Sequence, residues 1–144
     1  MVKYRYRLDG GDIMKKLSIF VLILFLAACS QTFNEQHVAF LEDKGWHVKE
    51  FVSEEIMPLD IPEEMLANYE ASGITFIRAY QGQEATEFVY NLKEKDTDGD
   101  SLKAVLYEVD GEVIGGFGIM SNWIPGLFDL ADQERLISDN MIEQ

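Results

Sequence analysis

Apolar residues recur at helical spacing in a segment around residue 40. Val38, Phe40 and Leu41 give this segment an apolar side, as expected of a helix that packs on a core. Asn34 is suited to cap its amino end, because its side-chain oxygen can accept from free backbone amides. Gly45 is suited to end it, since glycine readily adopts the left-handed conformation that follows a helix. The pattern predicts a helix over about residues 34–44.

A second helical segment begins at Pro62, which two glutamates follow. Proline and acidic residues are both favoured in the first turn of a helix. Its Met65, Leu66 and Tyr69 are expected to face the core, and Gly73 is the expected end. The pattern therefore predicts a second helix over about residues 62–72.

The middle of the chain alternates apolar and polar residues with the period of two that is typical of strands. Residues 86–92 show this alternation most fully, and strands are expected over about residues 48–57, 84–95, 102–109 and 112–120. Val48 and Val52 are expected on one side of the first strand. Asp110-Gly111 predicts a tight two-residue turn between the last two strands. Residues 74–82 fit either a short helical turn or a connecting strand, and residues 121–144 fit a tail with a short helix.

These elements predict one α+β domain, with an antiparallel sheet of about four strands and two helices packed on one of its faces. The length of 144 residues suits a single domain, and the sequence contains no internal repeat or interdomain linker.

A run that is apolar except for Ser18, Leu17–Ala28, stands apart near the start of the chain, directly after Met14-Lys15-Lys16. A positive segment, an apolar core of roughly 7–15 residues and small residues at a cleavage position are typical of an export signal. A membrane-spanning helix needs about 20 apolar residues, which is more than this run supplies. We expect residues 14–28 to be a cleaved signal peptide. Residues 1–13 are interpreted as an extension ahead of the true translation start at Met14, and a genuinely longer positive segment is the alternative.

The apolar run ends in Leu26-Ala27-Ala28-Cys29, which resembles the lipobox of bacterial lipoprotein signals. The resemblance implies cleavage between Ala28 and Cys29 and attachment of a diacylglyceryl group to the Cys29 sulfur. Two acyl chains suffice for stable anchoring. We therefore expect the chain to be anchored on the extracytoplasmic face of the cell membrane. Residues 29–36 would be the lipidated cysteine and its tether, and residues 37–144 would form the domain.

Charge separates the signal from the rest of the chain. Of 12 basic and 26 acidic residues, five basic and two acidic ones lie in the first 28, so the remainder has a formal net charge of −17. Nucleic acids and anionic headgroups repel such a surface, and no nucleic-acid partner is expected. Cys29 is the single cysteine, so the exported domain cannot form an internal disulfide.

The loop expected at residues 96–101 carries acids at alternate positions, Asp96, Asp98 and Asp100. Calcium prefers oxygen ligands at this spacing, as at the start of a helix–loop–helix calcium site. Ser101 stands where such a site needs glycine, and Tyr107 stands where it needs glutamate. A solvated hairpin loop is the favoured interpretation, and weak calcium binding is the alternative.

No arrangement of residues predicts catalysis. His37 and His47 are interpreted as surface histidines, because too few ligands accompany them for a zinc site. The glycines of residues 115–118 lack the strand–turn–helix context of a phosphate loop. Within a strand they indicate a bulge or a close approach by another backbone. We expect no enzyme activity and no cofactor. A cell-envelope hydrolase that uses a carboxylate pair is the alternative.

Aromatic residues are the remaining candidates for a binding site. Four are interpreted mainly as core, with an apolar groove as the alternative: Trp46, Tyr107, Phe117 and Trp123. One apolar stretch lies outside the expected elements and is a candidate contact patch if it is exposed: Trp123, Ile124, Leu127 and Phe128.

The segment Val38–Leu130 resembles an uncharacterised family of Gram-positive lipoproteins, the domain of unknown function family 4830. Six short motifs carry the resemblance: Phe40-Leu41, Gly45-Trp46-His47-Val48, Ile61-Pro62-Glu63-Glu64, Tyr80-Gln81-Gly82-Gln83, Phe88-Val89-Tyr90 and Asp110-Gly111-Glu112-Val113-Ile114-Gly115-Gly116. The chain departs from the family pattern at Phe117, where a polar residue is usual. The resemblance implies an exported, membrane-anchored single domain and assigns no activity.

Together these observations predict a membrane-anchored binding or interaction module without enzyme activity. The expected partners are the membrane, through the anchor on Cys29, and an unidentified extracytoplasmic protein or small ligand.

Overall fold

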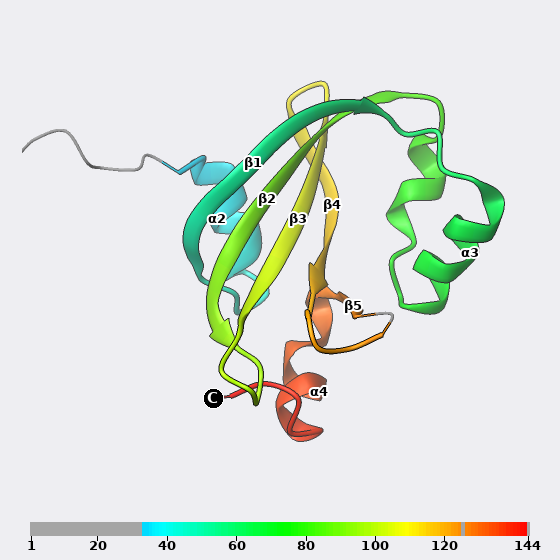
Figure 1. Ribbon diagram of the computed structural model, residues 1–144. Helices are drawn as coiled ribbons and strands as arrows, with labels where there is room; N and C mark the ends of the chain where they lie inside the picture. Colours follow the sequence, from blue (N-terminus) through cyan, green and yellow to red (C-terminus); the bar gives the residue numbers. More distant parts are fainter. Residues whose placement is uncertain (1–32, 125, 144) are drawn as a thin grey trace, which may run out of the picture. The chain divides into compact units, whose positions relative to one another are not determined.

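The computed structural model describes residues 33–124 and 126–143, which form a five-stranded antiparallel sheet (Figure 1). Each strand pairs with the next along the chain, in the order β1-β2-β3-β4-β5. The strands are β1 (Val48–Pro58), β2 (Glu84–Lys95), β3 (Ser101–Val109), β4 (Glu112–Ile119) and β5 (Leu127–Asp129). The helices are α2 (Glu35–Glu42), α3 (Glu63–Ala71) and α4 (Gln133–Ser138), with short 3-10 helices η1 (Phe76–Tyr80) and η2 (Leu130–Asp132). The predicted α+β class is confirmed, but the sheet has five strands rather than four.

Helix α2 begins and ends where its sequence predicts. The Asn34 side chain accepts a hydrogen bond from the backbone N–H of Gln36 at 3.0 Å. At the other end Gly45 has φ of +86°, and the backbone N–H of Trp46 returns to the carbonyl of Leu41 at 3.0 Å. This reversal directs Trp46 into the core, where its side chain is fully buried.

Helix α3 follows Pro62, and the chain leaves it at Gly73 with φ of +85°. Leu66 is buried and Tyr69 is half-buried, as predicted. Met65 was expected in the core as well, but it is 48% exposed. Leu66 and Tyr69 lie three residues apart and define the buried side, which leaves Met65 at its margin.

Residues 74–82 contain the helical turn η1, not a strand. Arg78 in this turn binds two glutamates of α3, Glu70 at 2.5 Å and Glu63 at 2.8 Å. Its hydrogen bonds to them lower the pKa of both carboxyls. This three-residue ionic cluster links η1 to α3.

Both faces of the sheet are covered. Ala104 and Leu106 of β3 belong to one buried cluster, which includes Leu41 of α2 and Leu136 of α4. The alternate residues of β3, Val105 and Tyr107, belong to a second cluster, which includes Leu66 of α3 and Ile77 of η1. Successive side chains of a strand point to opposite faces. The expectation that two helices share one face is therefore wrong: α2 and α4 pack on one face, and α3 packs on the other.

The hairpin between β3 and β4 has the predicted two-residue turn. Asp110 and Gly111 have φ of +53° and +79°, the left-handed pair that this tight turn requires. Further along β4, a β-carbon on Gly118 would lie 1.9 Å from the ring of Phe128, and one on Gly115 would lie 2.4 Å from the ring of Phe76. Side chains, rather than another backbone as expected, approach these two glycines, whereas the register shift between Tyr107 and Glu108, opposite Gly115, agrees with the expected bulge.

Strand β1 lies at one edge of the sheet, and its side chains are mostly exposed. Its register against β2 shifts twice, between Val48 and Glu50 and between Phe51 and Ser53. Each shift inserts one unpaired residue and interrupts the alternation of sides. Val52 falls in the second bulge and is 44% exposed, so its expected place beside the buried Val48 is wrong.

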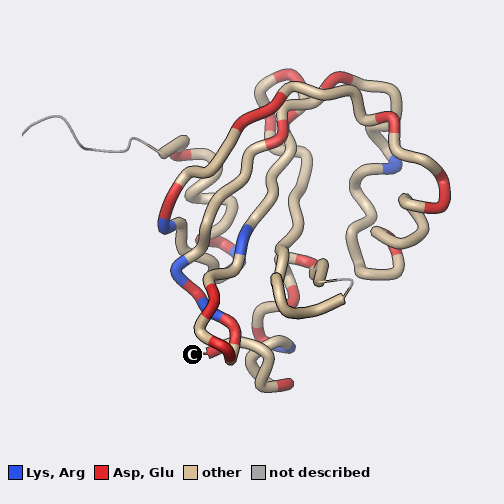
Figure 2. Tube along the Cα trace, viewed as in Figure 1, with Lys and Arg blue, Asp and Glu red and all other residues tan. Residues whose placement is uncertain are grey.

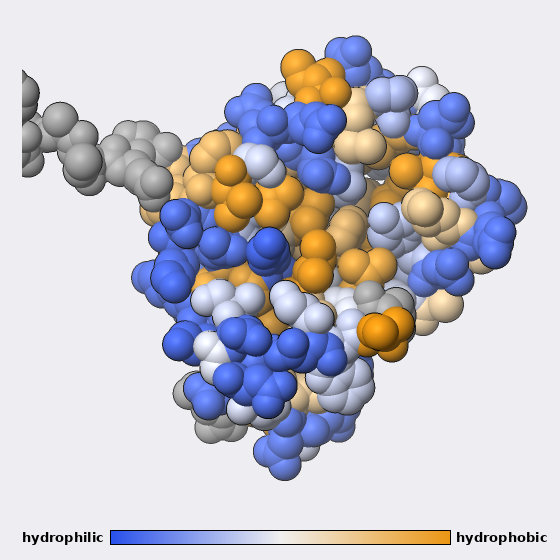
Figure 3. Space-filling view, in the orientation of Figure 1, coloured by the Kyte–Doolittle hydropathy of each residue, from blue (hydrophilic) through white to orange (hydrophobic). Residues whose placement is uncertain are grey.

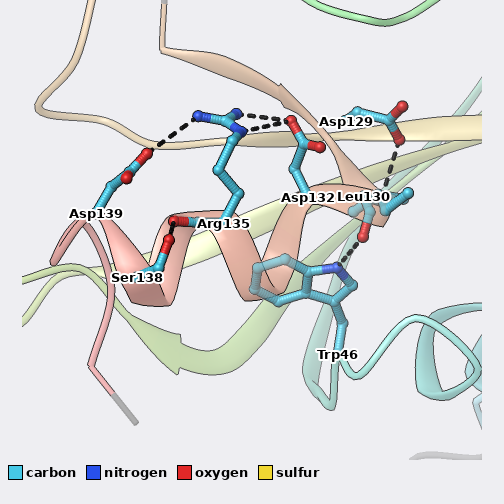
Figure 4. Close-up of polar contacts among 8 residues, drawn as sticks. Trp46, Asp129, Leu130, Asp132, Arg135, Ser138 and Asp139 are labelled. Atoms are coloured by element: carbon cyan, nitrogen blue, oxygen red, sulfur yellow. Dashed lines mark hydrogen bonds and ion pairs between the residues drawn. The ribbon is translucent and has the colours of Figure 1, made fainter.

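The carboxy-terminal segment is more than a tail with a short helix. The first residues after the turn that follows β4 pair with β4 as β5, and η2 and α4 follow. The indole nitrogen of Trp46 donates to the backbone carbonyl of Leu130 at 2.7 Å (Figure 4). This buried bond ties η2 to the turn after α2.

Several expectations concern residues outside the described part: the signal peptide, the cleavage after Ala28 and the lipidation of Cys29. The helices within residues 33–124 and 126–143 fall short of the length and hydropathy that a membrane span requires.

Candidate functional site

The predicted contact patch divides into an exposed part and a buried part. Ile124 is 99% exposed and Trp123 is 53% exposed, whereas Leu127 is half-buried. Phe128 is buried and packs on Trp46 with ring centroids 5.4 Å apart. Phe128 is therefore a core residue and is removed from the patch.

The exposed part sits on a tightly bonded turn. The backbone N–H of Met120 donates to the carbonyl of Gly126 at 2.7 Å. Gly126 is buried with φ of +71°, and a β-carbon there would lie within 2.6 Å of the carbonyl oxygens of Trp123 and Met120. Only glycine fits this position, so Gly126 secures the end of the turn that carries Trp123 and Ile124.

A small hollow of about 190 Å³ opens beside the turn. Trp123 and Ile124 line it, and Arg135 is the single charged residue in its wall. Apolar residues from four other parts of the fold complete the lining: Met120, Leu127, Phe128, Leu136 and Met141. Arg135 binds Asp132 at 2.6 Å and Asp139 at 3.5 Å (Figure 4). The cation at the rim is thus already neutralised by two carboxylates.

The acidic loop lies next to the same turn. Asn122, the residue before Trp123, donates from its side-chain nitrogen toward all three aspartates, at 3.3 Å to Asp96, 3.2 Å to Asp98 and 3.0 Å to Asp100. Asp96 is buried, and its other oxygen accepts from the backbone amides of Asp98 and Asp100. The candidate calcium loop is therefore closed around an amide group.

Calcium binding by this loop stays a prediction. Among the side chains that the structure describes, no group of three or more histidine, cysteine, aspartate or glutamate residues is arranged to hold a metal ion. The amide of Asn122 occupies the point on which the three carboxylates converge.

A second link joins the loop to the hollow. Asp96 forms an isolated β-bridge with Ile142. Met141, which precedes Ile142, lines the hollow. We refer to the turn residues Trp123 and Ile124, the hollow beside them and the loop of Asp96, Asp98 and Asp100 as the Trp123 surface. Figure 2 shows acidic residues gathered at this loop.

Both histidines were expected at the surface, and this expectation is right for His47 and wrong for His37. His47 is exposed and binds Glu94 at 2.7 Å, as expected of a surface residue. His37 is fully buried, with Nε2 2.5 Å from Glu108 and Nδ1 2.6 Å from the Tyr90 hydroxyl. A carboxylate only accepts, so Nε2 donates to Glu108, and Nδ1 shares a second hydrogen bond with the Tyr90 hydroxyl. Tyr90 is 2% exposed and cannot reach a substrate, so this chain of hydrogen bonds joins α2 to the sheet.

Carboxylates do gather in one open hollow of about 500 Å³ at the end of the sheet. It is lined by Glu84, Glu108 and Asp110 among others, and Glu108 is held in place by His37. Burial raises the pKa of the neighbouring Tyr90 to about 12, and the charge of Glu108 adds to this. This hollow is where the hydrolase alternative would have its carboxylate pair.

The other face of the sheet carries an apolar hollow of about 590 Å³ beside α3. Met65 and Tyr69 of α3 line it with Leu127, which also lines the small hollow of the Trp123 surface. Figure 3 shows apolar side chains gathered between the strands and α3, with hydrophilic residues around them. Trp46, Tyr107 and Phe117 are buried, which confirms the interpretation of these three aromatics as core, whereas Trp123 is exposed.

Comparison of the chain with family models, with curated proteins and with solved structures finds no match.

Proposed function

We propose that this chain is a lipoprotein anchored through Cys29 on the extracytoplasmic face of the membrane, and that its domain binds another protein without catalysing a reaction. The observation that carries the binding role is the exposure of Trp123 and Ile124 on a turn that Gly126 fixes. Tryptophan is among the residues most enriched in binding hot spots, and a large apolar side chain such as that of Ile124 gains from leaving water on contact.

The polar groups of the domain support the same proposal. The two ionic clusters around Arg78 and Arg135 are satisfied within the fold. The buried His37 and the half-buried Glu108 are likewise bonded to each other. Groups that are already bonded to each other stabilise local structure, whereas Ile124 has almost its whole side chain in solvent.

Site-specific photo-crosslinking in the native host tests the binding role. A photoreactive residue in place of Ile124 should form an adduct, and one in place of Ile56, which is 65% exposed on β1, should not. The adduct should disappear when Trp123→Ala is added. Adducts of equal yield at both positions would contradict a specific contact at the turn.

The anchor is tested separately. Radiolabelled palmitate should enter the chain, and Cys29→Ser should abolish the label and release the chain from the membrane fraction. A Cys29→Ser chain that stays with the membrane would contradict the proposal.

A hydrolase is the second candidate, favoured by the hollow that contains Glu84, Glu108 and Asp110. Glycoside hydrolysis by a carboxylate pair needs the two groups roughly 5–10 Å apart in a cleft. Release of soluble fragments from purified cell wall measures it, with Glu108→Gln as the test and Glu112→Gln as the matched control. Release that Glu108→Gln alone abolishes would make the chain an enzyme and overturn the first proposal.

A further inference from the structure

The Trp123 surface combines three features that specify the chemistry of a partner. They are the two exposed side chains, the small apolar hollow and the acidic loop. Asn122 and the segment of Met141 and Ile142 join them covalently and by hydrogen bonds. They therefore form one continuous surface rather than three separate ones.

The size of the hollow limits what enters it. Pockets that take whole small molecules have volumes of roughly 300–1,000 Å³, and this hollow has about 190 Å³. It has room for a single large apolar side chain, which would lie against Met120, Leu136 and Met141. Trp123 and Ile124 would then cover that side chain from the solvent side.

Charge sets the second requirement. Asp98 and Asp100 are exposed and accept from Asn122, the residue before Trp123, whereas Asp96 is buried. Arg135 lines the hollow, and its cluster with Asp132 and Asp139 has a net charge of −1. Lysines on the strands that lead into the loop offset part of this charge, but the chain after residue 28 carries −17 in all. A cationic partner is favoured both in contact and in its approach.

The same charges argue against two other occupants. An anionic bilayer surface is repelled by the acidic loop. A second copy of this chain would bring its own acidic loop against the first, and like charges that face each other are unfavourable. Neither occupant satisfies the apolar and the acidic features together.

We propose that the Trp123 surface binds a basic peptide segment of a partner protein, with one apolar side chain in the hollow and flanking lysine or arginine side chains at the acidic loop. This inference rests on the proposed binding role and names its partner class. The apolar side chain supplies most of the affinity, because it is the part that is fully removed from water. The basic side chains supply selectivity and a rate of association that falls with salt.

The test uses the full chain in zwitterionic lipid nanodiscs, with empty nanodiscs as the blank. Three short fluorescent peptides serve as probes, in which leucine alternates with lysine, with glutamine or with glutamate. Fluorescence anisotropy measures their binding to the wild-type chain and to Ile124→Ser and Trp123→Ala. The matched control is Ile56→Ser, which removes an equally apolar exposed side chain far from the surface in sequence.

We expect the lysine peptide to bind best, with an affinity that falls as salt is added. Ile124→Ser should weaken it by about tenfold, as expected for a hot-spot residue, and Ile56→Ser should leave it unchanged. If the glutamine or glutamate peptide binds best and the turn variants still weaken it, the basic partner class is wrong and the binding role stands. If the variants bind every peptide as well as wild type does, both are wrong. Stronger binding of the chain to protein-free anionic vesicles than to the lysine peptide would also overturn the inference.

Discussion

Gly118→Ala should destabilise the domain through one side chain, Phe128. These two residues are cross-strand partners in β4 and β5, and the aromatic ring lies over the glycine. An added β-carbon would fall 1.9–2.5 Å from three ring atoms, so the ring must leave its buried position. Gly118 lies outside the set of glycines with positive φ, so alanine introduces a steric conflict there without backbone strain.

The size of the effect follows from what the ring loses. Overpacking of a core costs about 1–3 kcal/mol, and moving Phe128 out of its buried site sacrifices a similar amount of transfer free energy. We expect Gly118→Ala to lower the free energy of unfolding by about 2–3 kcal/mol, which corresponds to a decrease in Tm on the order of 10 °C. Phe128→Leu alone should cost about 1–2 kcal/mol, because the smaller side chain leaves a cavity.

The double variant provides the decisive measurement. Leucine at position 128 does not extend over the glycine, so Gly118→Ala should cost little in that background. Urea unfolding followed by circular dichroism should therefore give a coupling of about 1–2 kcal/mol between the two positions. Gly111→Ala is the matched control, since its β-carbon meets nothing within 4 Å and its effect should add to that of Phe128→Leu. If Gly118→Ala and Phe128→Leu add as well, the account of this close approach is wrong.

Three further predictions concern the polar groups. Burial raises the pKa of Tyr90 to about 12, so the stability that its neutral form contributes is complete below about pH 10 and falls by about 1 kcal/mol per pH unit as the pH rises to about 12. Tyr90→Phe should therefore reduce the slope of the free energy of unfolding against pH in this range. An unchanged slope would contradict this. Asn122→Asp places a fourth carboxylate among three, so it should lower Tm in a chelator and make Tm rise with calcium; an Asn122→Asp chain as stable as wild type without calcium would refute the closed-loop interpretation. His37→Ala should lower the free energy of unfolding by about 2–4 kcal/mol, because it leaves a cavity in place of the buried ring and removes the hydrogen-bond partner of the buried Tyr90 hydroxyl. His47→Ala should change it by less than about 0.5 kcal/mol, and similar effects of the two would be inconsistent with the network around His37.

Local chemistry predicts much of the fold. The cap at Asn34, the stop signals at Gly45 and Gly73 and the tight turn at Asp110-Gly111 all act within a few residues. Each depends on backbone conformation that the residue type itself favours. These features were therefore readable from the sequence without knowledge of the tertiary structure.

The placement of helices on both faces was missed, although the sequence carries a signal for it. Residues 104–107 of β3 form a continuous apolar run, Ala-Val-Leu-Tyr. A run without alternation indicates a strand that is buried on both sides. The sequence also carries a signal for the burial of His37. This residue lies four positions before the buried Leu41 and hence on the same side of α2.

The candidate site was predicted only in part. The apolar stretch around Trp123 was identified, but the sequence could not divide it into the exposed Ile124 and the buried Phe128. A three-residue strand is too short to show alternation, and the position of Phe128 depends on the space above Gly118, which is distant in sequence. The contact of Asn122 with the acidic loop likewise joins residues more than 20 positions apart.

The two bulges of β1 hinder aggregation between copies of the chain that are held close together on one surface. An outer strand of eleven residues could act as a template on which sheets of successive molecules join into a filament. To continue the sheet, a neighbouring strand would have to reproduce both interruptions at matching points, because each one exchanges the sides of all residues beyond it. The adjacent Glu54 and Glu55 add repulsion between such strands. The irregular pairing of β1 with β2 thus disfavours extension of the sheet from one molecule to the next.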